Sequence, residues 1–187
     1  MRLVTAILLS APLFGADYTI DPARSSAGFS IKNMVVNTVN GQFSKVTGTI
    51  RYDAGNLAAA NVEATIDAST INTEDAKRDR HLKSADFFDV ATYPTLTFRS
   101  SKWSPGGKLA VAGNLTIHGV TKPVVLTLAE LPSETAAPTG GKQVSATATT
   151  KINRKDFGLT WNKLMDTGGA VVGDEVAITI RVVGTRK

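Results

Sequence analysis

The chain has 187 residues, of which 42% are hydrophobic and 20% are charged, a balance typical of one folded domain with a sizeable core. This composition excludes an intrinsically disordered protein. The absence of cysteine excludes a disulfide-stabilised scaffold, a thiolate metal site and membrane attachment through a lipidated cysteine. The net charge of +5 comes from basic residues dispersed along the chain without a recognised motif, so we expect no nucleic-acid partner.

Residues 1–16 are expected to be a secretory signal peptide. Arg2 supplies a positive start, an apolar run too short to span a bilayer follows it, and small residues come next at Gly15-Ala16. We therefore expect residues 17–187 to form the mature domain, in the periplasm or outside the cell. A buried first strand is the alternative, although period-two alternation begins only at Tyr18. The rest of the chain has no apolar run of about 18 residues, so no stable membrane insertion is expected.

The remaining chain is dominated by a period of two, which indicates β-strands with one apolar face. Val46, Gly48, Ile50 and Tyr52, for example, alternate with polar residues. The pattern predicts about eight strands, whose apolar positions lie at 29–31, 46–52, 62–68, 96–98, 109–117, 124–128, 144–152 and 176–182. Turn residues separate these strands at Asn40-Gly41, Ala54-Gly55-Asn56, Ser104 to Gly107, His118-Gly119 and 132–141. This spacing indicates an antiparallel meander.

Such strands can form either a sandwich or a barrel, and periodicity does not distinguish the two. Several positions on the apolar faces carry small side chains: Gly48, Ala64, Ala68, Gly113, Ala146 and Ala148. An eight-stranded barrel with these side chains inside would be incompletely filled, so a cavity is expected. In the alternative, the larger side chains of Phe29, Phe98 and Leu115 fill the space opposite the small ones.

One short helix is expected to interrupt the strands. Asn72 is predicted to cap it, with Glu74 and Asp75 in the first turn and basic residues toward its C-terminal end, as the helix dipole favours. The segment has almost no apolar face, so the helix should lie on the surface. Three apolar residues are expected to anchor the segment at one barrel end: Leu82, Phe87 and Phe88.

The sequence contains no recognised catalytic or cofactor-binding motif. His81 and His118 are its two histidines, and their spacing from carboxylates such as Asp86 matches no metal-ligand motif. No serine lies in a Gly-x-Ser-x-Gly turn, and no Gly-rich phosphate loop opens a helix. We therefore expect no enzyme activity, no metal and no cofactor, and we interpret both histidines as hydrogen-bonding residues.

The segment before the last strand, residues 154–174, is unusually apolar for a loop. Its apolar residues include Phe157, Leu159, Trp161, Leu164 and Met165. Two interpretations stay open. The segment is either a lid whose aromatic residues line the entrance of a lumen, or a flap that seals the core.

Two long motifs carry information that periodicity does not. The first runs from Arg78 to Phe98, with an Arg-Asp-x-His-Leu beginning, an aromatic pair and Tyr93-Pro94 before the strand. The second is Leu115-Thr-Ile-His-Gly-Val-Thr-Lys-Pro-Val124. In this order they resemble the YceI-like family of secreted lipid-binding proteins. The resemblance covers about Asp17 to Lys187 and implies an all-β, eight-stranded antiparallel barrel of lipocalin-like form, with a short surface helix inserted.

The resemblance also implies a ligand, a long-chain isoprenoid lipid held in the lumen for transport, storage or stress protection. An isoprenoid quinone and a polyprenyl phosphate both fit, since each buried CH₂ contributes about 0.8 kcal/mol. The predicted lipid-binding residues are Phe29, Phe43, Phe87, Phe88, Phe98, Leu115, Phe157, Trp161 and Met165. The candidate head-group contacts are Arg78, His81, His118 and Lys122. The alternative function is a rigid barrel scaffold that serves as an interaction or adhesion module without a lipid, and a homodimer is compatible with either.

Overall fold

The computed structural model describes residues 15–33, 37–104, 106, 108–163 and 171–187. The predicted signal peptide lies almost entirely outside these residues, so it stays a prediction. Among these residues, one α-helix, α1 (Ala76–Lys83), accompanies a single closed sheet. In the described part of the chain, no helix is long and apolar enough to cross a membrane.

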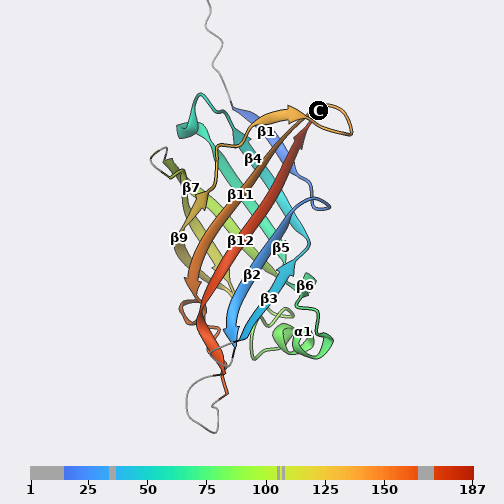
Figure 1. The fold of residues 1–187 in the computed structure, drawn as a ribbon, viewed down its shortest axis with the longest axis vertical. Helices are drawn as coiled ribbons and strands as arrows, with labels where there is room; N and C mark the ends of the chain where they lie inside the picture. Colours follow the sequence, from blue (N-terminus) through green and yellow to red (C-terminus); the bar gives the residue numbers. More distant parts are fainter. Residues whose placement is uncertain (1–14, 34–36, 105, 107, 164–170) are drawn as a thin grey trace, which may run out of the picture.

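The sheet is an antiparallel barrel with eight strand positions around its circumference (Figure 1). Single strands fill five positions: β7 (Thr95–Ser104), β8 (Ala110–Ile117), β9 (Val120–Leu128), β11 (Lys142–Asn153) and β12 (Val172–Arg186). Each of the other three positions is occupied by two consecutive strands, one after the other along the barrel wall. These pairs are β1 (Ala16–Ile20) with β2 (Ser26–Asn33), β3 (Asn37–Phe43) with β4 (Val46–Tyr52), and β5 (Asn61–Asp67) with β6 (Ile71–Asn72). The short β10 (Glu134–Ala136) pairs with β11. The predicted eight-stranded barrel with one short helix is confirmed.

Where one strand of a shared position ends and the next begins, the backbone groups in between still form hydrogen bonds. Between β1 and β2, the Asp21 N–H donates to the Val183 carbonyl (2.8 Å), and the Val183 N–H donates to Ser25 Oγ (3.0 Å). Between β5 and β6, a 3-10 turn at Ala68–Thr70 is capped by Asp67, whose carboxylate accepts from the Ser69 N–H (3.0 Å). Because unpaired buried backbone groups are costly, these substitute bonds allow the strands to bend without opening the barrel.

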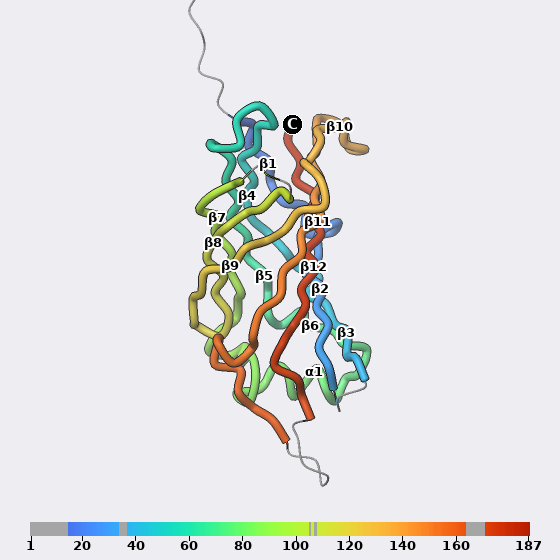
Figure 2. The backbone as a smooth tube through the Cα atoms, turned by 60° about the vertical axis from the view of Figure 1, so that its left-hand side comes forward, coloured from blue at the N-terminus to red at the C-terminus, as the bar shows by residue number. Residues whose placement is uncertain are grey.

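The two ends of the barrel differ. The helix α1 lies at one end, whereas β10 and the C-terminus lie at the opposite end (Figure 2). None of the α1 residues is buried, as expected for a surface helix. The two ends therefore offer different chemistry to anything inside the barrel.

The Asn40-Gly41 pair lies inside β3, so its prediction as a turn was wrong. Gly41 pairs with Phe29 of β2, and a Cβ added to Gly41 would lie 2.4 Å from Phe29 Cζ. The glycine makes room for an aromatic ring on the neighbouring strand. The connection between β2 and β3 instead includes residues 34–36, outside the described part.

The helix α1 begins later than predicted, because its N-cap is Asp75. The Asp75 carboxylate accepts hydrogen bonds from the backbone N–H groups of Lys77 (2.9 Å) and Arg78 (3.0 Å). Asn72 instead accepts from the Glu74 N–H (2.8 Å) in the preceding turn. Glu74 has a φ of 64°, a left-handed conformation that an α-helix does not accommodate, so the predicted cap at Asn72 was wrong.

At the end opposite α1, one carboxylate joins three strands. Glu134 of β10 accepts hydrogen bonds from Lys142 (2.7 Å), from the hydroxyl of Tyr18 in β1, and from Arg186 in β12 (2.8 and 3.0 Å). These donors, Lys142 first, lower the pKa of Glu134 to about 2. Tyr18 is 2% exposed, and the Arg186 guanidinium lies 5.6 Å from its ring centroid. Because the Glu134 carboxylate stays ionised in mild acid, its ion pairs with Lys142 and Arg186 persist there and hold this end of the barrel together.

Replacing Glu134 by Gln should lower the melting temperature at neutral pH and matter less in acid. The folded pKa of about 2 lies below the ordinary value of 4.5, so the stabilisation is present above about pH 5 and is lost as pH falls toward 2. Thermal unfolding of both proteins, followed by circular dichroism between about pH 7 and about pH 2, measures this difference.

The matched control is Glu130→Gln, because the Glu130 carboxylate makes no hydrogen bond or ion pair with the described residues. It should change the melting temperature little at any pH. A Glu134→Gln deficit that stays constant down to about pH 2 would contradict the account.

Candidate ligand-binding site

A cavity of about 800 Å³ occupies the barrel interior, a volume in the range of small-molecule sites. Its walls are mainly inward-facing apolar side chains of the barrel strands, among them Ile50, Ile66, Val111, Leu126, Ile178 and Val182. The small residues Ala64, Ala146 and Ala148 also line it. Phe29, Phe98 and Leu115 line the cavity and do not fill it, so the expected unfilled lumen is confirmed.

The other small residues have different roles. A Cβ on Gly113 would lie 2.5 Å from the Phe98 ring, so the glycine leaves room for that ring. A Cβ on Gly48 would lie 2.0 Å from the Glu63 carbonyl oxygen, which makes Gly48 a point of close strand approach. Ala68 is 1% exposed and packs in the core without bordering the cavity. The cavity therefore owes its space to alanines, and the glycines serve packing.

Polar side chains gather where the cavity reaches α1. Asn33 of β2, Arg78 and His81 of α1, and Arg154 after β11 all line this part. The exposed Lys77 borders it too, so the cavity meets the protein surface here, and we call this end the mouth. The opposite end, here called the far end, is filled by side chains between 1 and 7% exposed: Tyr18, Ile20, Tyr52, Trp103 and Val144.

An aromatic cluster narrows the mouth. The His81 ring stands nearly perpendicular to Trp161 (centroids 4.7 Å apart, 87°) and to Phe87 (5.1 Å, 89°). Phe87 and Trp161 are themselves 5.1 Å apart. His81 Nε2 also hydrogen-bonds the Asp86 carboxylate (2.8 Å), which fixes the ring orientation. The cluster joins α1 to the segment after β11, and of the two interpretations of that segment it favours a lining of the entrance.

Arg78 is oriented by the turn that precedes α1. Its Nε donates to Thr73 Oγ1 (2.8 Å) and its Nη2 donates to the Thr73 carbonyl (2.7 Å). Thr73 is 4% exposed and donates through its N–H (2.9 Å) and its hydroxyl (2.6 Å) to Asp79. Within the described residues, Arg78 Nη1 makes no hydrogen bond, so it can still donate to an anionic group at the mouth.

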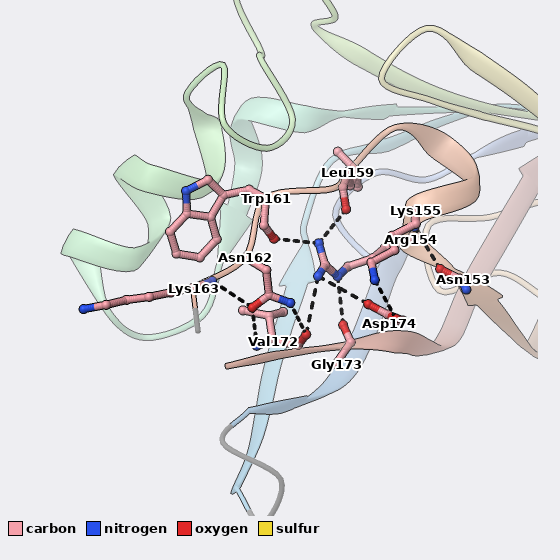
Figure 3. A network of polar contacts seen from close by, with 10 residues as sticks. All are labelled: Asn153, Arg154, Lys155, Leu159, Trp161, Asn162, Lys163, Val172, Gly173 and Asp174. Carbon is pink, nitrogen blue, oxygen red and sulfur yellow. Dashed lines mark hydrogen bonds and ion pairs between the residues drawn. The ribbon is translucent and has the colours of Figure 1, made fainter. Parts of the chain in front are cut away.

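Arg154 is a buried cation that sequence analysis did not select (Figure 3). It is 3% exposed, and burial lowers its pKa from the ordinary value while the Asp174 carboxylate opposes this shift. Its acceptors are the carbonyl groups of Gly173 (2.8 Å), Leu159, Trp161 (2.9 Å) and Val172 (3.4 Å) and the carboxylate of Asp174 (3.5 Å). Because these bonds use all its N–H groups, Arg154 clamps the segment 159–161 to the start of β12 and keeps no donor for a ligand.

Most of the predicted lipid-binding residues border the cavity: Phe29, Phe43, Phe87, Phe88, Phe98, Leu115 and Trp161. Phe157 is 2% exposed but does not line it, since it ends the 3-10 turn Arg154–Phe157 that packs between β9 and β11. Met165 lies outside the described residues. The arrangement brings the aromatic residues together, and their role in binding stays a prediction.

The four predicted head-group residues separate into two pairs. Arg78 and His81 line the mouth. His118 lies in the β8–β9 turn with a φ of 50°, where its ring packs on Tyr93 (4.6 Å), and Lys122 is exposed on β9. Neither of these borders the cavity, because the first is held by a turn and the second points to solvent.

Metal ligands do not converge in the described part of the chain, where no group of three or more His, Cys, Asp or Glu side chains could hold an ion. The aromatic contacts of His81 and His118 account for both rings without a metal. The metal-free state stays a prediction that elemental analysis can check.

A family model described as the YceI-like domain matches residues 18–184. The chain belongs to the YceI-like family. Protein YceI of Salmonella newport is 36% identical over 188 residues, which cover 99% of this chain and 95% of the relative. A UPF0312 protein of Vibrio cholerae is 36% identical over 165 residues, which cover 85% of this chain and 87% of the relative.

Solved structures share the architecture. BcnA of Burkholderia cenocepacia superposes with a TM-score of 0.76 at 28% identity, covering 89% of this chain and 99% of that one. The YceI protein of Campylobacter jejuni gives a TM-score of 0.69 at 25% identity, covering 100% and 99%. A polyisoprenoid-binding domain from Saccharophagus degradans, implicated in plant cell wall breakdown, gives a TM-score of 0.66 at 16% identity. The match covers 91% of this chain and 98% of that domain. This last likeness shows a common fold.

In this YceI-like barrel, Arg154→Met should lower the free energy of unfolding by at least about 3 kcal/mol, because several buried carbonyl groups lose a charged donor. Urea unfolding measures the loss. The matched control is Lys155→Met, which removes one exposed ion pair with Asp174 (2.9 Å) and should cost less than about 1 kcal/mol. Similar small losses for both variants would contradict the clamp.

Proposed function

We propose that this protein binds a long-chain isoprenoid lipid in the barrel lumen. The observation that carries the proposal is the 800 Å³ apolar cavity, whose charged lining residues gather at one end. Apolar walls favour a hydrocarbon chain by about 0.8 kcal/mol per buried CH₂ and recognise it without directionality. The shared fold with a domain named for polyisoprenoid binding supports the same ligand class.

The ligand is an isoprenoid quinone or a polyprenyl phosphate, and the protein carries or stores it, or protects it under stress. The site of action is the periplasm or the cell exterior, after removal of residues 1–16. The proposal contains no catalytic step. The competing scaffold function would be served by a filled core, whereas alanines at Ala64, Ala146 and Ala148 leave the core open at a cost in packing.

Enlarging one of these alanines should block the ligand and leave the fold intact. Ala146→Leu adds apolar volume to the cavity wall in the middle of β11, so the affinity for a short-chain isoprenoid quinone should fall at least about tenfold. The added side chain occupies open space, so the melting temperature of the ligand-free protein should change by only about 3 °C or less. Fluorescence titration and thermal unfolding measure the two effects.

The matched control is Thr147→Leu, the next residue on β11, which is exposed on the opposite face. It should leave quinone affinity unchanged. If Ala146→Leu kept its quinone affinity, or if the variant lost much of its thermal stability, Ala146 would not face open space in the lumen.

Removing the free donor at the mouth should affect charged ligands selectively. Arg78→Ala should weaken a polyprenyl phosphate about tenfold more than a neutral quinone of equal chain length, since only the phosphate gains a charge-assisted bond. The difference should shrink as salt rises. Lys122→Ala removes an exposed cation that does not border the cavity and is the control. Equal losses for both ligands in Arg78→Ala would exclude Arg78 as a head-group contact.

A further inference from the structure

The guanidinium of Arg78 has two hydrogen-bonding edges, and they are used differently. The side edge consists of Nε and one N–H of Nη2, and the end edge consists of Nη1 and the other N–H of Nη2. Thr73 takes the side edge, because Nε donates to its Oγ1 (2.8 Å) and Nη2 donates to its carbonyl oxygen (2.7 Å). Thr73 is 4% exposed, so this edge faces the protein. Arg78 itself is only half-buried and lines the mouth, which leaves the end edge for a ligand.

The position of Thr73 is in turn fixed by Asp79. Asp79 Oδ1 accepts from the Thr73 hydroxyl (2.6 Å) and from the Thr73 backbone N–H (2.9 Å). An arginine can only donate and an ionised carboxylate can only accept, so the hydroxyl must accept from Arg78 and give its proton to Asp79. Each donor and acceptor in this chain therefore has one role, and Asp79 acts on Arg78 through a neutral hydroxyl.

The indirect arrangement leaves the Arg78 charge available. Arg78 makes no ion pair with the described residues. The nearby Asp75 carboxylate is occupied as the helix cap, where it accepts from the backbone N–H groups of Lys77 and Arg78. A carboxylate bound directly to the guanidinium would take the parallel donors that an anionic ligand needs. With Thr73 between them, Asp79 can orient Arg78 without competing for its end edge.

We propose that the end edge of Arg78 is a bidentate site for the phosphate of a prenyl phosphate, and that Thr73 and Asp79 are its positioning residues. Nη1 and Nη2 each donate to one phosphate oxygen, a match of planar fork and anion that a single carbonyl oxygen of a quinone cannot reproduce. Selectivity for the anionic head group then depends on the orientation of Arg78 as well as on its charge. This inference rests on the proposed function and adds the geometry of head-group recognition and two residues that set it.

Arg78→Lys separates the fork from the charge. Lysine keeps the positive charge but offers a point-like ammonium group without parallel donors. The affinity for farnesyl phosphate should therefore fall at least about fivefold, while the affinity for a quinone with an equally long tail should change less than about twofold. Fluorescence titration measures both. An Arg78→Lys variant that binds farnesyl phosphate as well as the unmodified protein does would overturn the bidentate site.

Asp79→Ala distinguishes positioning from simple electrostatics, because the two predict opposite signs. Removing a carboxylate makes the mouth more positive, which by itself would strengthen phosphate binding. Loss of the Thr73 anchor should instead weaken farnesyl phosphate at least about threefold and leave the quinone unaffected. The matched charge control is Glu74→Gln, since the exposed Glu74 carboxylate makes no hydrogen bond or ion pair with the described residues. It should not weaken phosphate binding. Stronger phosphate binding in Asp79→Ala would overturn the positioning role.

The ligand-free protein provides a readout that does not depend on lipid binding. The Arg78 Nε–H should give a resolved NMR signal with slow hydrogen exchange, because it donates to a buried hydroxyl. Thr73→Val replaces the hydroxyl by a methyl group and should speed this exchange at least about tenfold and lower farnesyl phosphate affinity, whereas Thr73→Ser should restore both. Fast exchange of the Nε–H in the unmodified protein, or slow exchange in Thr73→Val, would overturn the proposed orientation.

Failure of the inference and failure of the function can be told apart. Quinone binding without farnesyl phosphate binding overturns the phosphate site, while lipid binding in the lumen survives. Failure of the unmodified protein to bind either ligand overturns the proposed function and, with it, the role of Arg78 in head-group recognition.

Discussion

Closure of the sheet along β12 is the constraint on which the lumen depends. One edge of β12 pairs with β11 from Lys142–Arg186 to Asn153–Glu175, and the other edge pairs with β1 and β2. Closure turns the alternating apolar faces toward one enclosed volume. An eight-stranded barrel is just wide enough for side chains to fill its interior. Alanines on facing strands leave that interior open, so the cavity is a consequence of side-chain size in a fixed circumference.

Among the described strands, β9 and β11 share the fewest paired residues of any two neighbouring strand positions in the barrel. The described residues pair these strands at Leu128–Ala148 and Thr127–Thr149, below which the 3-10 turn Arg154–Phe157 packs between them. Phe157 fills the space, and Arg154 ties the following backbone to β12. Buried charge is normally costly, and here the cost is offset by a complete set of acceptors. The clamp also holds the aromatic cluster at the mouth, because Arg154 donates to the carbonyl of Trp161, one of its members.

Alternation made the strands predictable from sequence, and capping and charge predicted the inserted helix. The resemblance to the YceI-like family implied the barrel, and the small residues on its apolar faces then predicted an open lumen. Local signals were less specific: the glycine of Asn40-Gly41 accommodates the Phe29 ring, and Asp75 replaces Asn72 as the helix cap because Glu74 is left-handed. These outcomes depend on neighbours that local sequence does not identify.

Arg154 illustrates the same limit in the candidate site. Arginine is usually exposed, and its burial is decided by four carbonyl groups from separate parts of the chain. One signal was available for the mouth, since the Arg-Asp-x-His-Leu motif places Arg78 and His81 on the same short helix.

The central claim is that the lumen holds a prenyl lipid, and the most direct measurement is the lipid content of the protein itself. The mature protein, secreted by its own host and purified without detergent, is extracted with organic solvent, and the extract is analysed by mass spectrometry. We expect close to one equivalent of an isoprenoid lipid per folded chain. An extract without prenyl lipid, from protein whose circular dichroism shows the native barrel, would contradict it.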